Sequence, residues 1–456
     1  MKFKMSREVD LGREPVGKLL LILALPAITS QVVNALYNMV DRMYIGHIET
    51  IGSLALTGVG VCFPIIMIIS AFAYLLGMGG APRASIYMGK RKNHEAEKIL
   101  GNCFSSLIIV AIILTIIVLL CKEPLLYLFG ASEQTLPYAV QYIEIYAIGT
   151  IFVQVTLGMN SFISAQGFST ISMLTVVIGA ITNIILDPIL IFVFHMGVQG
   201  AALATILSQA ISALWAVRFL CGKQTILRLK KENLRIQKKV LMPCIALGVS
   251  PFAMQSTESI LVLCFNSSLL YHGGDLAVGA MTILSSIMQF AMLPLQGLTQ
   301  GGQPIISYNY GANQPARIKK AFFLQTAVCF GYTTLMWLAI LLVPQLFVAI
   351  FTNDPALTQM SIWALRIYMA GILLMGLQTS CQQTFIAFGN SKISAFLAIY
   401  RKIIVLIPLI YILPHFFEDE VFAIFLAEPI ADTIAVATTV TLFTITFKKL
   451  MKSMHQ

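Results

Sequence analysis

Long apolar segments recur from one end of the chain to the other, separated by short polar loops. Each is longer than the roughly 20 residues that a helix needs to cross the hydrocarbon core of a bilayer. No stretch between them is long or polar enough for a soluble domain. The pattern predicts twelve transmembrane helices, at about 19–45, 53–78, 99–121, 138–160, 170–194, 197–219, 241–266, 275–302, 321–344, 360–386, 393–415 and 420–446.

The composition agrees with a chain that lies in lipid. Of 456 residues, 58% are hydrophobic and only 11% are charged, against about 25% charged in soluble domains. The fold class is therefore all-α and integral to the membrane. The eight cysteines and six histidines are scattered, with no metal-ligand spacing, so we expect no cofactor.

The net charge of +10 has an ordered distribution that does not indicate nucleic-acid binding. Basic residues concentrate in segments 1–18, 83–98, 218–239, 317–320 and 448–456. The alternate loops 46–52, 267–274, 345–359 and 416–420 have none, and loop 122–137 has only Lys122. Short loops rich in Lys and Arg stay in the cytoplasm. We therefore expect a multi-pass protein of the cytoplasmic (inner) membrane with both termini inside. The tail 1–18 is too polar for a cleaved signal.

The chain contains an internal repeat with an offset of 222 residues. GGAPRASIYMGKRKNHEAEKI from Gly79 aligns with GGQPIISYNYGANQPARIKKA from Gly301. Six helices per half keep both halves in one orientation, as in transporters that handle substrate between two bundles. The predicted domains are a cytoplasmic tail 1–18, an N-lobe 19–221, a basic linker 222–240, a C-lobe 241–447 and a second tail 448–456.

Polar residues inside the first half mark a candidate site, because charges in a bilayer are costly and usually functional. Asn34, Asn38 and Asp41 share a helix face, with Gln31 just above, and so do Asn183 and Asp187. Thr205 adds a hydroxyl. Such oxygens suit Na⁺, and a buried carboxylate can instead carry a proton. Two structural alternatives remain open: an Asp41–Arg42 ion pair, and a hydrogen-bonded cluster without an ion.

The second half has acids and amides of its own. Glu258 follows Gln255 by three residues. Two amide stripes either line a water-filled cavity or join helices: Gln289, Gln296, Gln300 and Gln303, then Gln378 and Gln382. We expect Glu428 and Asp432 to pair with Arg401. The repeat places Glu144 opposite Arg366, which indicates either a salt bridge between lobes or two unrelated local pairs.

Three stretches resemble the multidrug and toxic compound extrusion (MATE) family. They are SQVVNALYNMVDRMYIGH (30–47), the repeated GG-x-P-x-x-S-x-x-x-G, and NIILDPILIFVFHMGVQGAALAT (183–205). The resemblance covers essentially the whole chain and is nearest to the MepA-type branch, near the DinF-like transporters. It implies two six-helix lobes around a V-shaped cavity. It also implies antiport of a cationic or amphipathic organic compound against Na⁺ or H⁺.

The resemblance also implies site residues. In DinF-like relatives a cation site joins residues that match Asp41, Tyr142, Asn183, Asp187 and Thr205 here, with Tyr138 and Tyr146 near Tyr142. NorM-type relatives carry a glutamate ten residues after a glycine, as Gly248 and Glu258 do here. Their acid in the tenth helix has no counterpart in 367–386, which favours the N-lobe. For substrate contacts we expect Asn34, Asn38, Gln255, Glu258, Gln289 and Gln296.

Other functions are less well supported by the sequence. A flippase for lipids or lipid-linked precursors needs basic residues for phosphate, and only Arg366 and Arg401 are candidates against several acids. No HExxH, GxSxG or filter-like sequence indicates an enzyme or a channel. We therefore expect a monomeric exporter of small organic cations in the bilayer, with Na⁺ and H⁺ both open as the coupling ion.

Overall fold

The chain is almost entirely helical in the computed structural model, which describes residues 9–48 and 51–454. Residues 1–8 and 455–456 of the expected tails and 49–50 of the loop 46–52 lie outside the described residues. The first part comprises α1 (Val16–Gly46), α2 (Gly52–Gly89), α3 (Asn93–Leu128), α4 (Leu136–Ile148), α5 (Thr150–Ala165), α6 (Ser169–Pro188), the π-helix η1 (Ile189–Val193), α7 (Gly197–Cys221) and the 3-10 helix η2 (Lys231–Asn233). The second comprises α8 (Lys238–Gly311), α9 (Pro315–Leu342), α10 (Pro344–Val348), α11 (Pro355–Tyr368), η3 (Met369–Gly371), α12 (Ile372–Ala387), α13 (Ser391–Ile399), the π-helix η4 (Tyr400–Leu406), α14 (Ile407–Ile412), η5 (Leu413–Phe416) and α15 (Glu420–Ser453).

The helices agree with the predicted all-α membrane fold and its twelve crossings. Within the described residues, ten helical segments are long and apolar enough to cross a membrane, and α4 with α5 forms an eleventh that bends by 57°. The 74-residue α8 is really two helices, because Gly274 has φ 66° and breaks it. Its two arms therefore count as two crossings.

Several predicted boundaries were wrong where helices bend rather than end. The segment 138–160 is not one straight helix but α4 and α5, which meet at Gly149. A side chain there would clash, because a Cβ on Gly149 would lie 2.3 Å from Ile206. The predicted loop 267–274 is helical as far as Gly273, so α8 turns back over a single residue.

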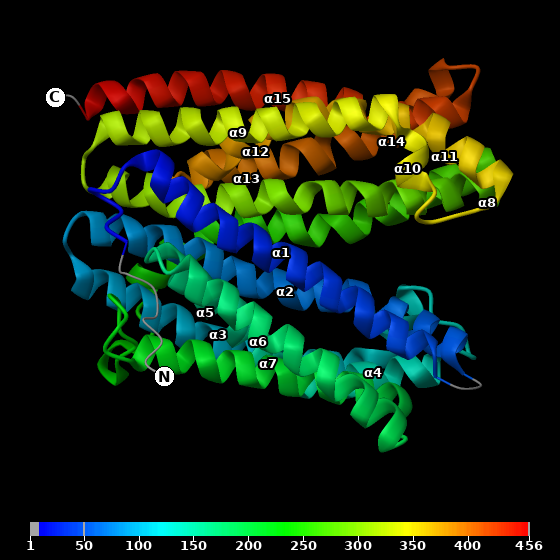
Figure 1. Cartoon of the computed structure of the whole chain (residues 1–456), viewed down its shortest axis with the longest axis horizontal. Helices are drawn as coiled ribbons and strands as arrows, with labels where there is room; N and C mark the ends of the chain where they lie inside the picture. The colour runs from blue at the N-terminus through cyan, green and yellow to red at the C-terminus, as the bar shows by residue number, and fades with distance from the viewer. Residues whose placement is uncertain (1–8, 49–50, 455–456) are drawn as a thin grey trace.

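The first half (α1 to α7) and the second half (α8 to α15) form two bundles side by side (Figure 1), and the described part of the chain begins and ends at the same end of the molecule. The halves meet where α1 and α2 pack against α8. This joint includes glycines at repeat-related positions. A Cβ on Gly79 would lie 2.2 Å from the Cys244 carbonyl oxygen, and one on Gly301 would lie 2.5 Å from Ala24 Cα.

The same symmetry recurs nearer the basic loops. A Cβ on Gly89 would lie 2.0 Å from the Tyr308 carbonyl oxygen, and one on Gly311 would lie 1.9 Å from that of Ile86. Each residue of one contact is 222 positions from its counterpart in the other. The first and last glycines of the GG-x-P-x-x-S-x-x-x-G motif are therefore explained by close backbone approach between the halves, whereas Gly80 and Gly302 face side chains of their own half.

We expect Gly89→Ala to destabilise the protein by about 1–3 kcal/mol, because the added methyl group overpacks the joint. The matched control is Gly60→Ala in the same helix, where a Cβ meets nothing within 4 Å. This control gains helix propensity and should be neutral or slightly stabilising. Thermal unfolding in detergent compares the two. Equal melting temperatures for both variants would contradict the packing role of Gly89.

Candidate functional site

Polar side chains from four helices of the first half converge below the protein surface. The carboxyl groups of Asp41 on α1 and Asp187 on α6 face each other within hydrogen-bonding range. Asn183 Nδ2 donates to Asp187 Oδ1 at 3.3 Å and to Thr205 Oγ1 on α7 at 3.4 Å. Tyr142 on α4 has its hydroxyl near Thr205. The five residues predicted as the cation site therefore lie together.

The local sequence explains how α6 presents two of these groups. Asn183 and Asp187 are one helical turn apart and both are fully buried. Pro188 follows directly and cannot donate a hydrogen bond to the carbonyl one turn back. The helix then widens into the π-helix η1, a change often found at functional sites. Asp187 thus stands where the regular backbone pattern ends.

The cluster has more acceptors than donors. Asp41 Oδ1, Asn183 Oδ1 and Asp187 Oδ2 are buried and have no hydrogen-bond partner among the described residues. A buried polar group without a partner costs free energy, and a buried carboxylate costs more. Three such oxygens in one place make the cluster a candidate cation site. Either a metal cation with oxygen ligands or a proton fits such a site.

One tyrosine and one amide that were not predicted from the sequence lie beside the cluster. Tyr37 lies one turn before Asp41 and near Gln209, which is one turn after Thr205 on α7. Tyr142 stacks on Tyr146 with 6.2 Å between ring centroids. Helical spacing alone could have found Tyr37 and Gln209, because each shares a face with a predicted residue.

The rest of the predicted stripe on α1 does not join this cluster. Asn34 and Asn38 are exposed, and Asn38 Nδ2 donates to the Asn34 carbonyl oxygen at 2.7 Å. Nor does Arg42 neutralise Asp41. Its guanidinium carbon lies 5.0 Å from the centroid of the Phe63 ring, and no Asp41–Arg42 ion pair occurs among the described residues. That alternative is wrong.

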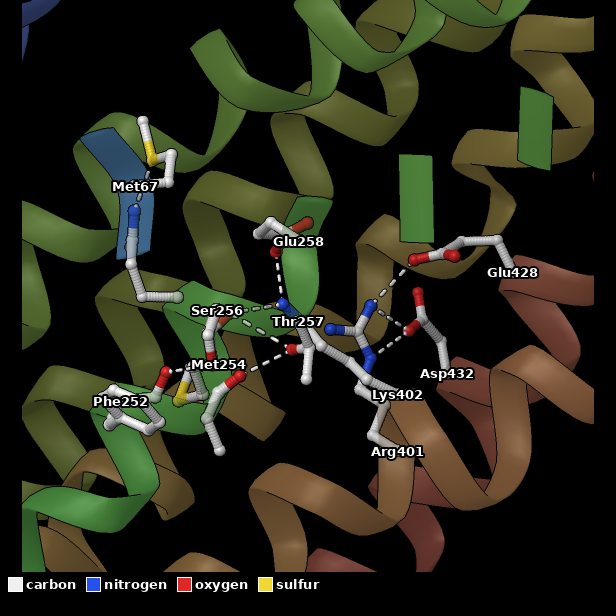
Figure 2. A network of polar contacts seen from close by, with 12 residues as sticks. Met67, Phe252, Met254, Ser256, Thr257, Glu258, Arg401, Lys402, Glu428 and Asp432 are labelled. Carbon is white, nitrogen blue, oxygen red and sulfur yellow. Dashed lines mark hydrogen bonds and ion pairs between the residues drawn. The ribbon is translucent and has the colours of Figure 1, made fainter. Parts of the chain in front are cut away.

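The second half carries a different charged network (Figure 2). Arg401 Nη2 lies 2.9 Å from Glu428 Oε1, and its Nε donates to Asp432 Oδ1 at 2.7 Å. This is the ion pair that the sequence predicted between helices. Beside it, Lys402 pairs with Glu258 and donates to the Met254 carbonyl oxygen at 2.9 Å.

Lys402 changes the interpretation of Glu258. From the sequence, Arg366 and Arg401 were the expected basic residues within the bundles, and Glu258 was an expected substrate contact. The Lys402 side chain is only 6% exposed, whereas that of Glu258 is 59% exposed. The ammonium group is therefore buried behind the carboxylate and neutralises it.

The amide stripes join helices at some positions and are exposed at others. Gln382 Nε2 joins helices, donating to Ser250 Oγ at 3.0 Å, and Gln31 Nε2 donates to Gln300 Oε1 of the other half at 3.1 Å. Gln289 and Gln296 are instead exposed on α8. Gln255 Nε2 contacts Met67 Sδ at 2.7 Å, again between the halves.

The outer acids and bases form local contacts. Glu144 pairs with Lys122 of its own half. Arg366 takes part in no ion pair within residues 9–48 and 51–454 and lines a shallow groove with Trp363. No salt bridge thus joins Glu144 to Arg366, and the first of the two readings is wrong.

Comparison with known proteins identifies the architecture. A family model described as MatE matches the chain twice, over residues 26–189 and 249–412. The chain belongs to the MatE family. The double match agrees with the internal repeat and confirms the resemblance drawn from the sequence.

MatE relatives match along nearly the full length. A protein described as "Multidrug export protein MepA" from Staphylococcus haemolyticus is 25% identical, over 92% of each chain. A structure described as MATE in the bent conformation superposes with a TM-score of 0.92 at 23% identity, covering 99% of this chain and all of the other. An outward-facing multidrug resistance MATE transporter gives 0.91 at 23% identity, over 98% and 99%. These structures share the fold.

The two MatE repeats carry their charges at different places. Shifted by 222 residues, Asp41 and Asp187 correspond to Leu263 and Leu409. In the other direction, Arg401 and Lys402 correspond to Gly179 and Ala180. The paired carboxylates thus occur in one repeat only, and the paired cations only in the other.

Proposed function

We propose that the protein is a cation-coupled antiporter that exports cationic or amphipathic organic compounds from the cytoplasm. Membership of the MatE family supports transport, and the relatives named for multidrug export support the substrate class. The observation that carries the coupling proposal is the group of unpartnered buried oxygens on Asp41, Asn183 and Asp187.

The coupling ion would act by changing how the helices of the first half pack. Asp41 and Asp187 repel each other when both are charged and no ion is bound between them. A cation or proton between the two carboxylates removes the repulsion. α1 carries Asp41 and also packs against α8 of the other half. A shift of α1 would therefore reach the joint between the halves. Coupling requires that ion and substrate prefer different states.

The oxygen set suits Na⁺ somewhat better than H⁺. One shared proton satisfies the facing carboxyl groups but leaves Asn183 Oδ1 without a donor. A metal ion can contact the two carboxylates and this amide oxygen together, with Thr205 and Tyr142 adjacent. The alternative, H⁺, requires only Asp41 and Asp187.

The substrate would meet a polar but largely uncharged surface. Asn34 and Asn38 on α1 and Gln289 and Gln296 on α8 are exposed, and Glu258 is already paired with Lys402. Flexible apolar side chains with a few amides suit varied amphipathic compounds. A lipid flippase is less well supported, because Arg401 and Lys402 are both paired with carboxylates.

Transport in proteoliposomes tests the proposal. We expect efflux of a fluorescent organic cation such as ethidium when an inward Na⁺ gradient is imposed at equal pH. Efflux driven only by a pH gradient would assign the coupling to H⁺. If neither gradient drives ethidium efflux while a labelled phospholipid crosses the bilayer, the flippase replaces the antiporter.

We also propose that the protein is a monomer in the cytoplasmic membrane with both termini inside. Labelling of terminal tags in intact cells would check the position of the termini.

A further inference from the structure

A groove of about 810 Å³ lies on the surface of the second half, between α9 and α15 with α12 beneath. It lies toward the end of the molecule where the chain terminates (Figure 1). Its apolar lining includes four phenylalanines, with Phe322 stacked on Phe443 at 4.5 Å between ring centroids and Phe447 beside them. Phe323 at its wall is 62% exposed. Exposed aromatic surface of this size in a membrane protein faces lipid or a ligand.

The rim of the groove is basic. Lys319 stands in the second turn of α9, and Lys448 and Lys452 stand at the end of α15. None of the three forms an ion pair within the described part of the chain. Segments 315–326 and 440–456 contain no acidic residue. In addition, Thr326 Oγ1 inside the groove is buried without a hydrogen-bond partner. The groove thus combines an apolar floor with positive charge and a free hydroxyl.

The equivalent surface of the first half shows what fills such a groove. The repeat relates Lys319 to Glu97 and Phe323 to Gly101. There the linker between the halves lies over α3. Lys230 Nζ lies 2.7 Å from Glu97 Oε2, and the Arg228 backbone amide donates to Glu97 Oε1 at 3.1 Å. The linker backbone lies so close that a Cβ on Gly101 would be 2.4 Å from the Asn233 carbonyl oxygen.

That linker brings apolar side chains as well as charge. Leu227 is fully buried and packs with Leu100 and Leu220 in one core cluster, with Ile226 and Leu229 beside it. In the first half, then, a segment with apolar and basic groups covers a surface whose key residue is acidic. In the second half the charge at the equivalent position is positive, because Lys319 stands where the first half has Glu97. No described segment covers the groove there.

We propose that this groove binds an anionic phospholipid from the surrounding leaflet. The acyl chains would lie on the phenylalanines, and the phosphate would lie among Lys319, Lys448 and Lys452. Basic pockets between transmembrane helices recognise anionic head groups in this way. Long lysine side chains reach the head-group region while their stems cover apolar surface. The lipid would take the place that the linker has in the first half.

Native mass spectrometry of the full-length protein tests this site. Delipidated protein is titrated with phosphatidylglycerol or with phosphatidylcholine of identical acyl chains. We expect one phosphatidylglycerol to bind with clear preference. The variant Lys319→Ser/Lys448→Ser/Lys452→Ser should lose roughly fivefold in affinity per lysine, on the order of 100-fold in total, and so approach phosphatidylcholine. Thr326→Trp fills the groove without changing charge and should weaken both lipids.

The control replaces three exposed lysines outside the groove, as Lys238→Ser/Lys239→Ser/Lys449→Ser, and should bind like the unaltered protein. Equal losses in both triple variants, or equal affinity for both lipids, would overturn the proposal in favour of general surface attraction.

Two other occupants of the groove would give distinct results. Binding that appears only after removal of residues 1–8 would assign the groove to that segment. A dimer that Thr326→Trp dissociates would assign it to a second copy. Melting temperatures of all variants verify folding.

Discussion

Asp187→Asn is expected to abolish coupled export while leaving the protein folded. The substitution keeps the shape of the side chain but removes its ability to carry a charge or exchange a proton. The new amide can donate to the carboxylate of Asp41, which lies within hydrogen-bonding range, so the buried acceptors gain a permanent partner. Gradient-driven efflux of an organic cation should fall by about 100-fold, the upper part of the usual range for coupling between sites.

Stability distinguishes this result from simple damage. The apparent melting temperature of Asp187→Asn should equal or exceed that of the unaltered protein, because the amide satisfies an oxygen that is otherwise without a donor. Addition of the coupling ion should raise the melting temperature of the unaltered protein by mass action but not that of the variant. Glu144→Gln is the matched control. It removes a carboxylate of the same half, paired with Lys122, and should leave export nearly unchanged. Normal efflux in Asp187→Asn would refute the coupling site.

The sequence predicted the first-half site because its residues follow simple helical arithmetic. Asn183 and Asp187 share a face by their spacing, Asp41 and Thr205 are polar residues within other apolar segments, and the family resemblance added Tyr142. Helical spacing also places Tyr37 and Gln209 on the same faces as predicted residues. Neither is charged, however, and intramembrane charge was the main criterion for a candidate site residue. The carboxylates of the candidate site were therefore predictable from the sequence, whereas part of their surroundings was not.

The second half was less accessible to sequence reasoning, because charge pairing depends on helix contacts that no spacing reveals. Glu428 and Asp432 share a face, which made a partner on another helix a reasonable prediction. Lys402 adjoins Arg401, and the two side chains reach different helices from the π-helix η4. Neither the widened helix nor the contact with Glu258 follows from an apolar run with two basic residues. From its sequence, the linker is likewise only a basic loop. Its contacts with Glu97 and Gly101 in the structure show that it covers α3 of the first half.

Glu258→Gln is expected to destabilise the protein far more than Lys402→Met does. The carboxylate is exposed and can be solvated alone, whereas the ammonium group of Lys402 is almost fully buried. Removing Glu258 leaves that ammonium group with only the Met254 carbonyl oxygen as an acceptor among the described residues. Breaking a buried ion pair from one side costs about 3–5 kcal/mol. Thermal unfolding in detergent should therefore show a marked loss for Glu258→Gln and a small one for Lys402→Met.

The two variants should also separate in substrate binding. Lys402→Met leaves the exposed carboxylate of Glu258 without its paired ammonium group, so affinity for organic cations should rise by roughly fivefold or more, while neutral amphiphiles bind as before. The double variant Glu258→Gln/Lys402→Met removes both charges and should recover most of the stability lost in Glu258→Gln. Stability is recovered only if Glu258 and Lys402 interact, because the stability losses of two independent sites would add up in the double variant. Greater instability in the double variant than in Glu258→Gln would show that Glu258 and Lys402 stabilise the second half separately. Unchanged cation affinity in Lys402→Met would mean that the carboxylate does not face the substrate. The asymmetry of burial within one ion pair thus predicts opposite consequences for its two members.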